Sequence, residues 1–198
     1  MVFDFDGTLT VRDSLPFMLK AVSRPRWPFY VKLLCSAPWL VGYVLHLVPA
    51  AQAKERLISR FVKSMTTAEF ESRCHEQAQK VRHRLLRPDM VSRLECHVSQ
   101  GDKVYVCSAN IDTWIEQCLE PIKVPIVSTC LEVSDGKLTG RFATLNCNGA
   151  EKWNRMRATV ETSGLPLTVY GDSKGDEALM SHAQEAFHVD KKGKVSAL

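Results

Sequence analysis

The segment VFDFDGTLT, residues 2–10, decides the fold and the candidate site of this chain. Its first apolar residues are typical of the end of a buried strand. Two carboxylates follow at a spacing of two, Asp4 and Asp6. Residues i and i+2 of a strand point the same way, so both acids are expected at the strand's carboxyl end. In an open α/β sheet that end is where ligands bind. Two carboxylates held there repel each other, which predicts a bound cation, acid–base chemistry or both.

Two ordinary interpretations of this acid pair compete with a functional one. An EF-hand loop beginning at Asp4 needs Asp or Asn at its fifth position and Glu at its twelfth, where this chain has Thr8 and Leu15. A plain turn rich in Asp and Gly is the second interpretation. Against it stands another acidic cluster, YGDSKGD at residues 170–176, which follows the apolar run 165–169. Two acid clusters at strand ends favour a site for a divalent cation.

Hydrolysis of a phosphate ester suits such a site. An anionic phosphate centre repels nucleophiles, so a catalyst has to neutralise charge and position the attacking group. Asp4 is the candidate nucleophile that forms an aspartyl-phosphate. Asp6 is the candidate acid that protonates the leaving oxygen and the base that then deprotonates water. Mg²⁺ is the expected cofactor, with Asp4 and Asp172 as direct ligands, because carboxylates, substrate phosphate and water are its usual partners.

The order of four motifs along the chain resembles that of the haloacid dehalogenase superfamily. These motifs are DFDGT at 4–8, VYVCSAN at 104–110, NCNGAEK at 146–152 and GDSKGD at 171–176. They are most similar to the phosphoserine-phosphatase-like branch, subfamily IB, which includes phosphatidylglycerophosphatase C-like members. The resemblance covers the core nearly end to end, whereas between residues 15 and 85 it rests on length and helical character.

The resemblance implies roles for further residues. The main-chain carbonyl of Asp6 is expected to bind the metal, and Asp13 to contact substrate at the hinge of a cap. Gly7 supports the tight turn, and Asp176 either contacts the metal through water or holds Lys152. The phosphate-binding groups are expected to be Thr8, Ser108, the backbone N–H of Ala109, and Lys152.

Structural roles remain open for several of these residues. Ser108 is also a good N-cap for a helix, a position compatible with anion binding. By its helical position alone Lys152 is by default a surface lysine, and only its place in the motif order favours phosphate binding. Gly7 and Thr8 are also typical of a simple turn. Asp13 suits helix capping with the residue after it. Cys107 is interpreted as a buried strand position rather than a catalytic thiol.

Bulk properties narrow the functional classes. A chain of 198 residues can bury one core with room for a small insertion. The net charge of +4, without a long Lys/Arg run, argues against a nucleic-acid binder. Seven cysteines without a Cys-x-x-Cys pair predict neither a disulfide framework nor a zinc site and favour a reducing cytoplasm. The basic residues 82–84 with Arg87 are interpreted as a solvated helix face rather than a contact for an anionic substrate. No signal-peptide pattern precedes the first strand, and a longer native N-terminus stays open.

The predicted fold class is α/β, a Rossmann-like three-layer core with a mainly parallel sheet and an inserted α-helical cap. Strand and helix patterns alternate over residues 1–13 and 88–198, which we assign to the core. Residues 14–87 lack strand alternation and are assigned to a C1-type cap that excludes water and contacts substrate. Within the core we expect helices at 88–99 and 111–119, a strand at 125–128, and a β-hairpin at 130–142 around Asp135-Gly136.

Residues 27–49 are the least ordinary part of the cap. They include an uncharged run, 33–45, which Pro38 interrupts and which is shorter than a membrane-spanning helix. Packing within the cap is the favoured interpretation. The alternative is a helix at a membrane interface, with its aromatic residues at the level of the lipid headgroups. These aromatic residues are Trp27, Tyr30, Trp39 and Tyr43.

The main hypothesis is therefore a cytoplasmic, Mg²⁺-dependent phosphatase acting on a lipid or small-metabolite phosphomonoester. A phosphotransferase of the same fold is the nearest alternative. A dehalogenase is disfavoured because Asp6 and the acids at 172 and 176 suit a metal and phosphate rather than a halide. From another class, the chain could be a membrane-surface or protein-binding module with a non-catalytic core. Peripheral contact at the inner membrane face through 27–49 stays open, as do the substrate and the oligomeric state.

Overall fold

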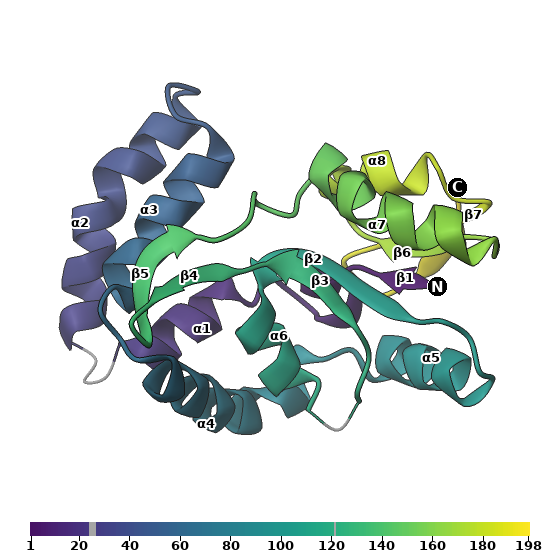
Figure 1. Cartoon of the computed structure of the whole chain (residues 1–198), viewed down its shortest axis with the longest axis horizontal. Coiled ribbons are helices and arrows are strands. Elements are labelled where there is room, and N and C mark those ends of the chain that lie inside the picture. The colour runs from purple at the N-terminus through teal and green to yellow at the C-terminus, as the bar shows by residue number, and fades with distance from the viewer. Residues whose placement is uncertain (24–26, 121) are drawn as a thin grey trace.

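The computed structural model describes residues 1–23, 27–120 and 122–198 (Figure 1). A six-stranded sheet with the order β3-β2-β1-β6-β7-β8 forms its centre. All neighbouring strands in it are parallel except β7 and β8. The strands are β1 (Val2–Phe3), β2 (Tyr105–Ile111), β3 (Ile126–Thr129), β6 (Thr168–Gly171), β7 (Glu185–Val189) and β8 (Val195–Ala197).

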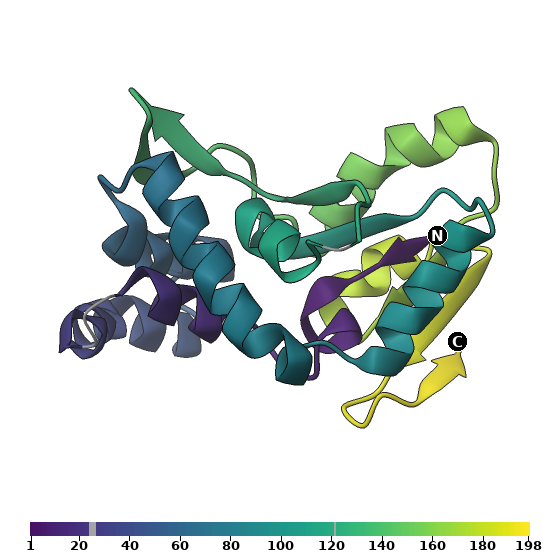
Figure 2. The ribbon, with the colours of Figure 1, turned by 90° about the horizontal axis from the view of Figure 1, so that it is seen from below.

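Helices cover both faces of this sheet because side chains alternate across each strand. Phe3 and Tyr170 face one side, where their rings stack with centroids 4.5 Å apart beneath α5 (Pro88–Ser99). Val2 and Val169 face the other side, against α7 (Ala150–Ser163) and α8 (Glu177–Met180). Figure 2 shows α5 and α7 on opposite sides of the strands. The predicted α/β fold with a mainly parallel sheet and three layers is confirmed.

Most expected elements of the core are present. α5 spans the predicted residues, and α6 (Asp112–Cys118) follows β2 closely. The hairpin of β4 (Leu131–Ser134) and β5 (Lys137–Phe142) turns at Asp135 and Gly136, which both have positive φ angles of 50° and 72°. A type I′ turn needs such angles, which explains the Asp-Gly pair. The C-terminal pairing of β7 with β8 was not predicted.

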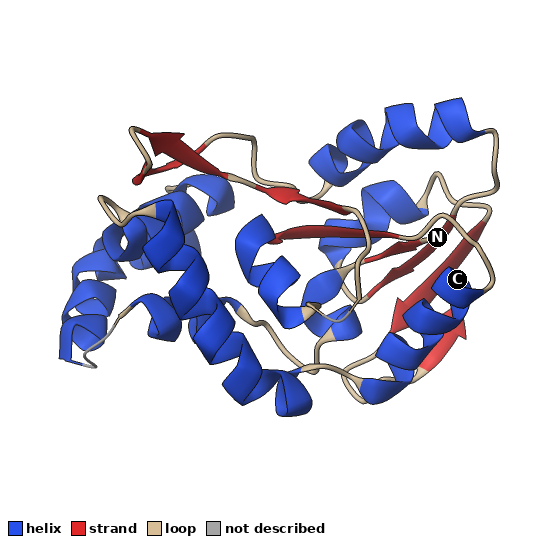
Figure 3. Ribbon diagram, turned by 60° about the horizontal axis from the view of Figure 1, so that its bottom comes forward, coloured by secondary structure: helices blue, strands red, loops and turns tan. Residues whose placement is uncertain are grey.

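The range 14–87 forms four helices in its described part, as its composition predicts (Figure 3). Pro38 lies inside α2 without ending it, and Pro49 precedes α3. Pro25 lies outside the described residues. The helices are α1 (Leu15–Val22), α2 (Trp27–Val44), α3 (Ala50–Val62) and α4 (Thr67–Leu85).

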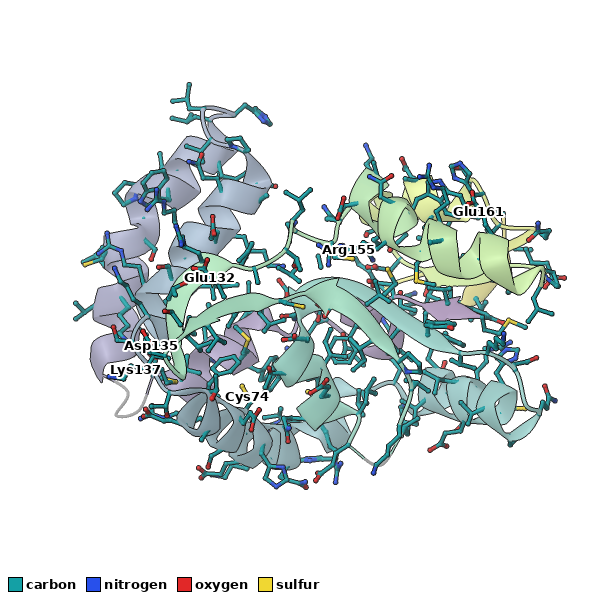
Figure 4. All side chains as sticks on the ribbon, viewed as in Figure 1. Cys74, Glu132, Asp135, Lys137, Arg155 and Glu161 are labelled. Carbon is teal, nitrogen blue, oxygen red and sulfur yellow. The ribbon has the colours of Figure 1, made fainter. Side chains whose placement is uncertain are left out.

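The β4–β5 hairpin packs against these helices rather than against the main sheet. Ser64 N donates to Leu138 O at 2.8 Å, and Phe142 N donates to the Glu55 carboxylate of α3 at 2.8 Å. Figure 4 labels Glu132 on β4, where its carboxylate accepts from Thr139 and Arg141 of β5. The sequence analysis assigned the hairpin to the core because it lies within residues 88–198. The hydrogen bonds of Leu138 and Phe142, however, join it to the helical segment 14–87.

The ring of Phe3 is fully buried between the central strands and α5, so truncation should leave a cavity. We expect Phe3→Ala to lower the free energy of unfolding by about 3–5 kcal/mol. Urea denaturation followed by circular dichroism measures the effect. Leu145→Ala, at an exposed position, is the control and should change stability by less than about 0.5 kcal/mol. Equal losses in both variants would contradict the packing described for Phe3.

Candidate active site

A buried lysine lies between two carboxylates at the carboxyl edge of the sheet. Lys152, in the first turn of α7, is only 2% exposed. Its ammonium donates to Asp4 Oδ1 at the end of β1 and to Asp176 Oδ1 after β6, each at 2.5 Å. A buried ammonium is tolerated only when it is paired in this way. The interpretation of Lys152 as an exposed lysine is therefore wrong.

Charge in this cluster is unbalanced. Burial alone would lower the pKa of Lys152, but Asp4 and Asp176 raise it above its ordinary value, so the ammonium stays protonated. Burial raises the pKa of Asp4, and Lys152 opposes this shift. Burial also raises the pKa of Asp172, and the negative charge of Asp176 adds to the effect. Three carboxylates share one ammonium, so the cluster favours a further cation.

The oxygens of these carboxylates are close enough to bind one metal ion. One oxygen from each of Asp4, Asp172 and Asp176 lies within 4.8 Å of the others. Both oxygens of Asp176 already have partners, because Oδ1 accepts from Lys152 and Oδ2 from the backbone N–H and hydroxyl of Ser173 at 3.1 and 3.0 Å. Asp4 and Asp172 are therefore the better candidate ligands. An all-oxygen set suits Mg²⁺.

Gly7 allows Asp172 to reach Asp4. Its φ angle is +86°, and a Cβ atom there would lie 2.1 Å from Asp172 Oδ2. A side chain at this position would displace the carboxylate. The glycine of the first motif therefore permits a close approach between the β1 loop and the β6 loop, in addition to making the turn.

Asp6 points to a different set of partners. Its carboxylate accepts from Ser14 N at 2.8 Å and from the Asn110 side-chain amide at 2.7 Å. The Ser14 hydroxyl in turn accepts from Asn110 and from the indole of Trp114 at 2.9 and 2.8 Å. Burial and the nearby charge of Asp13 raise the pKa of Asp6, and the hydrogen bonds from Ser14 and Asn110 oppose this shift. The sequence prediction assigned no role to Asn110 or Trp114, and to Ser14 it assigned only helix capping together with Asp13.

Two buried hydroxyls complete this edge of the site. Ser108 lies within β2, while α6 begins only at Asp112, so the N-cap interpretation is wrong. The Thr8 hydroxyl is buried, and it has no hydrogen-bond partner among the described residues. A buried hydroxyl without a partner is unfavourable, which makes Thr8 a candidate contact for a bound anion. Ala109, expected to offer its N–H, accepts through its carbonyl from Thr129 at 2.8 Å.

Lys54 is a site residue that the sequence did not reveal. It belongs to α3, and its ammonium donates to Ala109 O at 2.8 Å. Burial lowers the pKa of Lys54, although the nearby carboxylates of Asp6 and Asp13 partly offset the effect. No motif marks this lysine, because only the packing of α3 brings it to the sheet edge.

Beside the cluster lies a cavity of about 420 Å³, to which Asp6, Asp13 and Asp172 contribute. Asp13 is exposed, and its carboxylate accepts from Leu15 N at 2.9 Å at the start of α1. Asp13 therefore accepts from the first N–H of α1, whereas Ser14, the N-cap residue, makes no side-chain capping bond. Contact of Asp13 with substrate stays a prediction. The cavity reaches Asp6 and Asp172 of the site, whereas Asp4 and Lys152 are not among its lining residues.

Arg87 and Cys107 are both buried, and their contacts are with other groups of the protein. Arg87 is buried, and its guanidinium donates to the carbonyls of Thr10 and Lys191, each at 3.1 Å, so its assignment to a solvated face is wrong. Cys107 is buried on β2 with its sulfur 3.8 Å from that of Cys147, and this contact together with burial raises its pKa. The prediction that Cys107 occupies a buried strand position is confirmed. All seven cysteines are free.

Fold and site together define an α/β protein with a candidate cation site at the carboxyl edge of its sheet. A model of haloacid dehalogenase-like hydrolases matches residues 1–181. The chain therefore belongs to the family of haloacid dehalogenase-like hydrolases, as the order of its motifs implied.

Individual relatives agree with this assignment. Protein CicA of Caulobacter vibrioides is 32% identical over 187 residues, or 93% of this chain and 83% of CicA. A solved Bordetella pertussis Tohama I protein of unknown function is 21% identical with a TM-score of 0.79, over 93% of this chain and 86% of that one. A phospho-aspartyl intermediate analogue of phosphoserine phosphatase is 17% identical with a TM-score of 0.62, over 93% and 83%. The two structures share the fold.

Gly7→Ala should weaken cation binding by about tenfold or more, because the new methyl group displaces the Asp172 carboxylate. Isothermal titration with Mg²⁺, or electron paramagnetic resonance with Mn²⁺, measures the affinity. Gly101→Ala is a matched control, since its φ of +82° imposes similar strain while nothing lies within 4 Å. Equal affinities of the two variants would exclude a metal site that includes Asp172.

Proposed function

We propose that this protein is a Mg²⁺-dependent phosphomonoesterase that forms an aspartyl-phosphate on Asp4. The observation that carries the proposal is the position of the Asp4 carboxylate, 2.5 Å from the Lys152 ammonium and within 4.8 Å of an Asp172 oxygen. A phosphoryl group that approaches Asp4 there also meets the ammonium of Lys152, whose positive charge offsets part of the repulsion from the carboxylates. A bound Mg²⁺ would add to this neutralisation.

Two carboxyl groups share the chemistry in this proposal. Asp4 attacks phosphorus, the bond to the ester oxygen breaks, and Asp6 gives its proton to the departing alcohol. Water then attacks the aspartyl-phosphate while Asp6 takes up a proton, which regenerates Asp4 and releases phosphate. The hydrogen bonds from Ser14 and Asn110 hold Asp6 in place through both steps.

The remaining groups bind and orient the substrate. The Mg²⁺ ligands in this proposal are Asp4, Asp172 and the main-chain carbonyl of Asp6. Asp176 binds Lys152, and the absence of a side chain at Gly7 leaves room for the Asp172 carboxylate. The phosphate-binding groups are the hydroxyls of Thr8 and Ser108, the N–H of Ala109 and the ammonium of Lys152. The orphaned Thr8 hydroxyl supports this assignment because a phosphate oxygen would satisfy it.

The helical segment 14–87 acts as a cap in this proposal, with residues 1–13 and 88–198 as the core. The contacts of the β4–β5 hairpin with α3 favour including residues 131–142 in the cap. Lys54 of the cap and Asp13, at the boundary between core and cap, are then the proposed contacts for the leaving part of the substrate. The substrate class is a small-metabolite or lipid phosphomonoester, as in subfamily IB with its phosphatidylglycerophosphatase C-like members, and the expected location is the cytoplasm.

Two alternatives make different use of the same residues. A phosphotransferase would pass the phosphoryl group from Asp4 to an alcohol instead of water. A non-catalytic scaffold would need neither the buried Lys152 nor the unpartnered Thr8 hydroxyl. Burying an ion cluster is unfavourable for stability, which argues for a functional reason to retain it.

Asp4→Asn should lower the rate of phosphate release by about 10³-fold or more, since a neutral amide cannot form the aspartyl-phosphate. The assay uses p-nitrophenyl phosphate with Mg²⁺, and EDTA should abolish the wild-type activity. Asp135→Asn, in the hairpin turn, is the control for an Asp-to-Asn change and should keep full activity. Retained activity in Asp4→Asn would remove Asp4 from the chemistry.

Asp6→Asn should separate the two steps. The p-nitrophenolate leaving group needs little protonation, so the first step persists while hydrolysis of the aspartyl-phosphate slows. Stopped-flow measurement should therefore show a burst of nitrophenol close to one equivalent per enzyme. A variant that is equally slow in both steps would contradict the role of Asp6.

In the wild type, equal amounts of nitrophenol and phosphate in the presence of glycerol indicate hydrolysis, whereas a deficit of phosphate indicates transfer.

A further inference from the structure

The outer face of α2 is apolar and exposed. Leu34 and Val41, seven residues apart on one side of α2, are 74% and 55% exposed, and Leu45, directly after the helix, is 60% exposed. Figure 1 shows α2 at the outer edge of the helical segment. The opposite face packs against the core through Phe29 and Leu33. The expectation that 27–49 packs within the cap therefore holds for the inner face and is wrong for the outer one. Contiguous exposed apolar surface of this kind marks an interaction site.

The charge around this face identifies its partner. Residues 14–54 contain no Asp or Glu. The basic residues of α1 and α2 are Lys20 and Lys32, whereas Lys54 of α3 donates to Ala109 O at the candidate active site. A second copy of the chain docked through this face would bring like charges together, which opposes association. A surface rich in anionic phospholipid is complementary to both the apolar and the basic side chains.

A basic cavity adjoins the face. It has a volume of about 490 Å³, and Tyr30, Lys20, Lys80 and Arg84 contribute to its walls. Lys80 forms an ion pair with Glu76 at 2.6 Å, so Lys20 and Arg84 carry the cavity's uncompensated charge among the described residues. The Ser23 hydroxyl, also on the wall, is buried and has no hydrogen-bond partner within the described ranges. Cations with an unpartnered donor fit a phosphate group.

We infer that the outer face of α2 and this cavity form one docking surface for an anionic phospholipid bilayer. The apolar side chains enter the interface, and the cavity accepts the phosphate of a lipid headgroup. No helix among the described residues is long and apolar enough to cross a membrane, which fits a helix lying along the surface. This surface is separate from Asp4 and its partners, so binding does not depend on the proposed phosphatase activity.

Flotation of the full chain with vesicles tests the apolar face. The wild type should bind vesicles of phosphatidylcholine with phosphatidylglycerol and bind phosphatidylcholine alone more weakly, with a difference that salt reduces. Leu34→Glu should lower the fraction bound about tenfold or more. Val98→Glu on α5, at a site 42% exposed, is the matched control and should bind like the wild type. Circular dichroism verifies that both variants fold.

A charge reversal tests the cavity. Arg84→Glu should reduce binding to the anionic vesicles about fivefold or more, with little change on neutral vesicles. Arg157→Glu, on α7, is the control for the same change of charge. Three results would each overturn the inference: wild-type protein that ignores anionic vesicles, equal binding by Leu34→Glu and Val98→Glu, or equal effects of Arg84→Glu and Arg157→Glu. A dimer in light scattering that Leu34→Glu abolishes, without vesicle binding, would assign the face to a second copy.

Discussion

The arrangement of the site depends on the ammonium of Lys152 between the carboxylates of Asp4 and Asp176. Each group comes from a different part of the chain, and none of the charges is stable at this depth without the others. The remaining oxygen of Asp176 orders the turn through Ser173, which places Asp172 over Gly7. One buried ion cluster thus determines where both candidate metal ligands lie.

The topology of the sheet explains why much of this could be predicted. β1, β2 and β6 are adjacent and parallel, so Asp4, Ser108 and Asp172 reach the same edge. Short apolar runs followed by acids or a hydroxyl mark such strand ends in the sequence. Lys152 carries no local mark, since a lysine in a first helical turn is ordinarily solvated. Only the order of the motifs indicated it, and its burial follows from contacts more than twenty residues away in sequence.

Residues that the sequence left unassigned act through long-range packing. Asn110 and Trp114 converge on Ser14, which holds Asp6, and these contacts span about a hundred positions. Arg87 was grouped with a basic stretch but supports the β1 loop through backbone carbonyls. Periodicity has a similar limit in α2, because an apolar stripe looks the same whether protein or lipid covers it. The exposed fractions in the folded chain show only that its own described residues leave the outer side of α2 uncovered.

α3 connects the two surfaces described above. It packs against the inner side of α2, receives the hairpin through Glu55, and extends Lys54 to the carbonyl of Ala109. A charged hydrogen bond from a partly desolvated lysine is worth more than a neutral one, so it resists separation of the helices from the sheet. The Ala109 carbonyl lies beside the groups expected to bind phosphate. The helix that supports the exposed face of α2 is therefore held directly at the edge where the acid cluster lies.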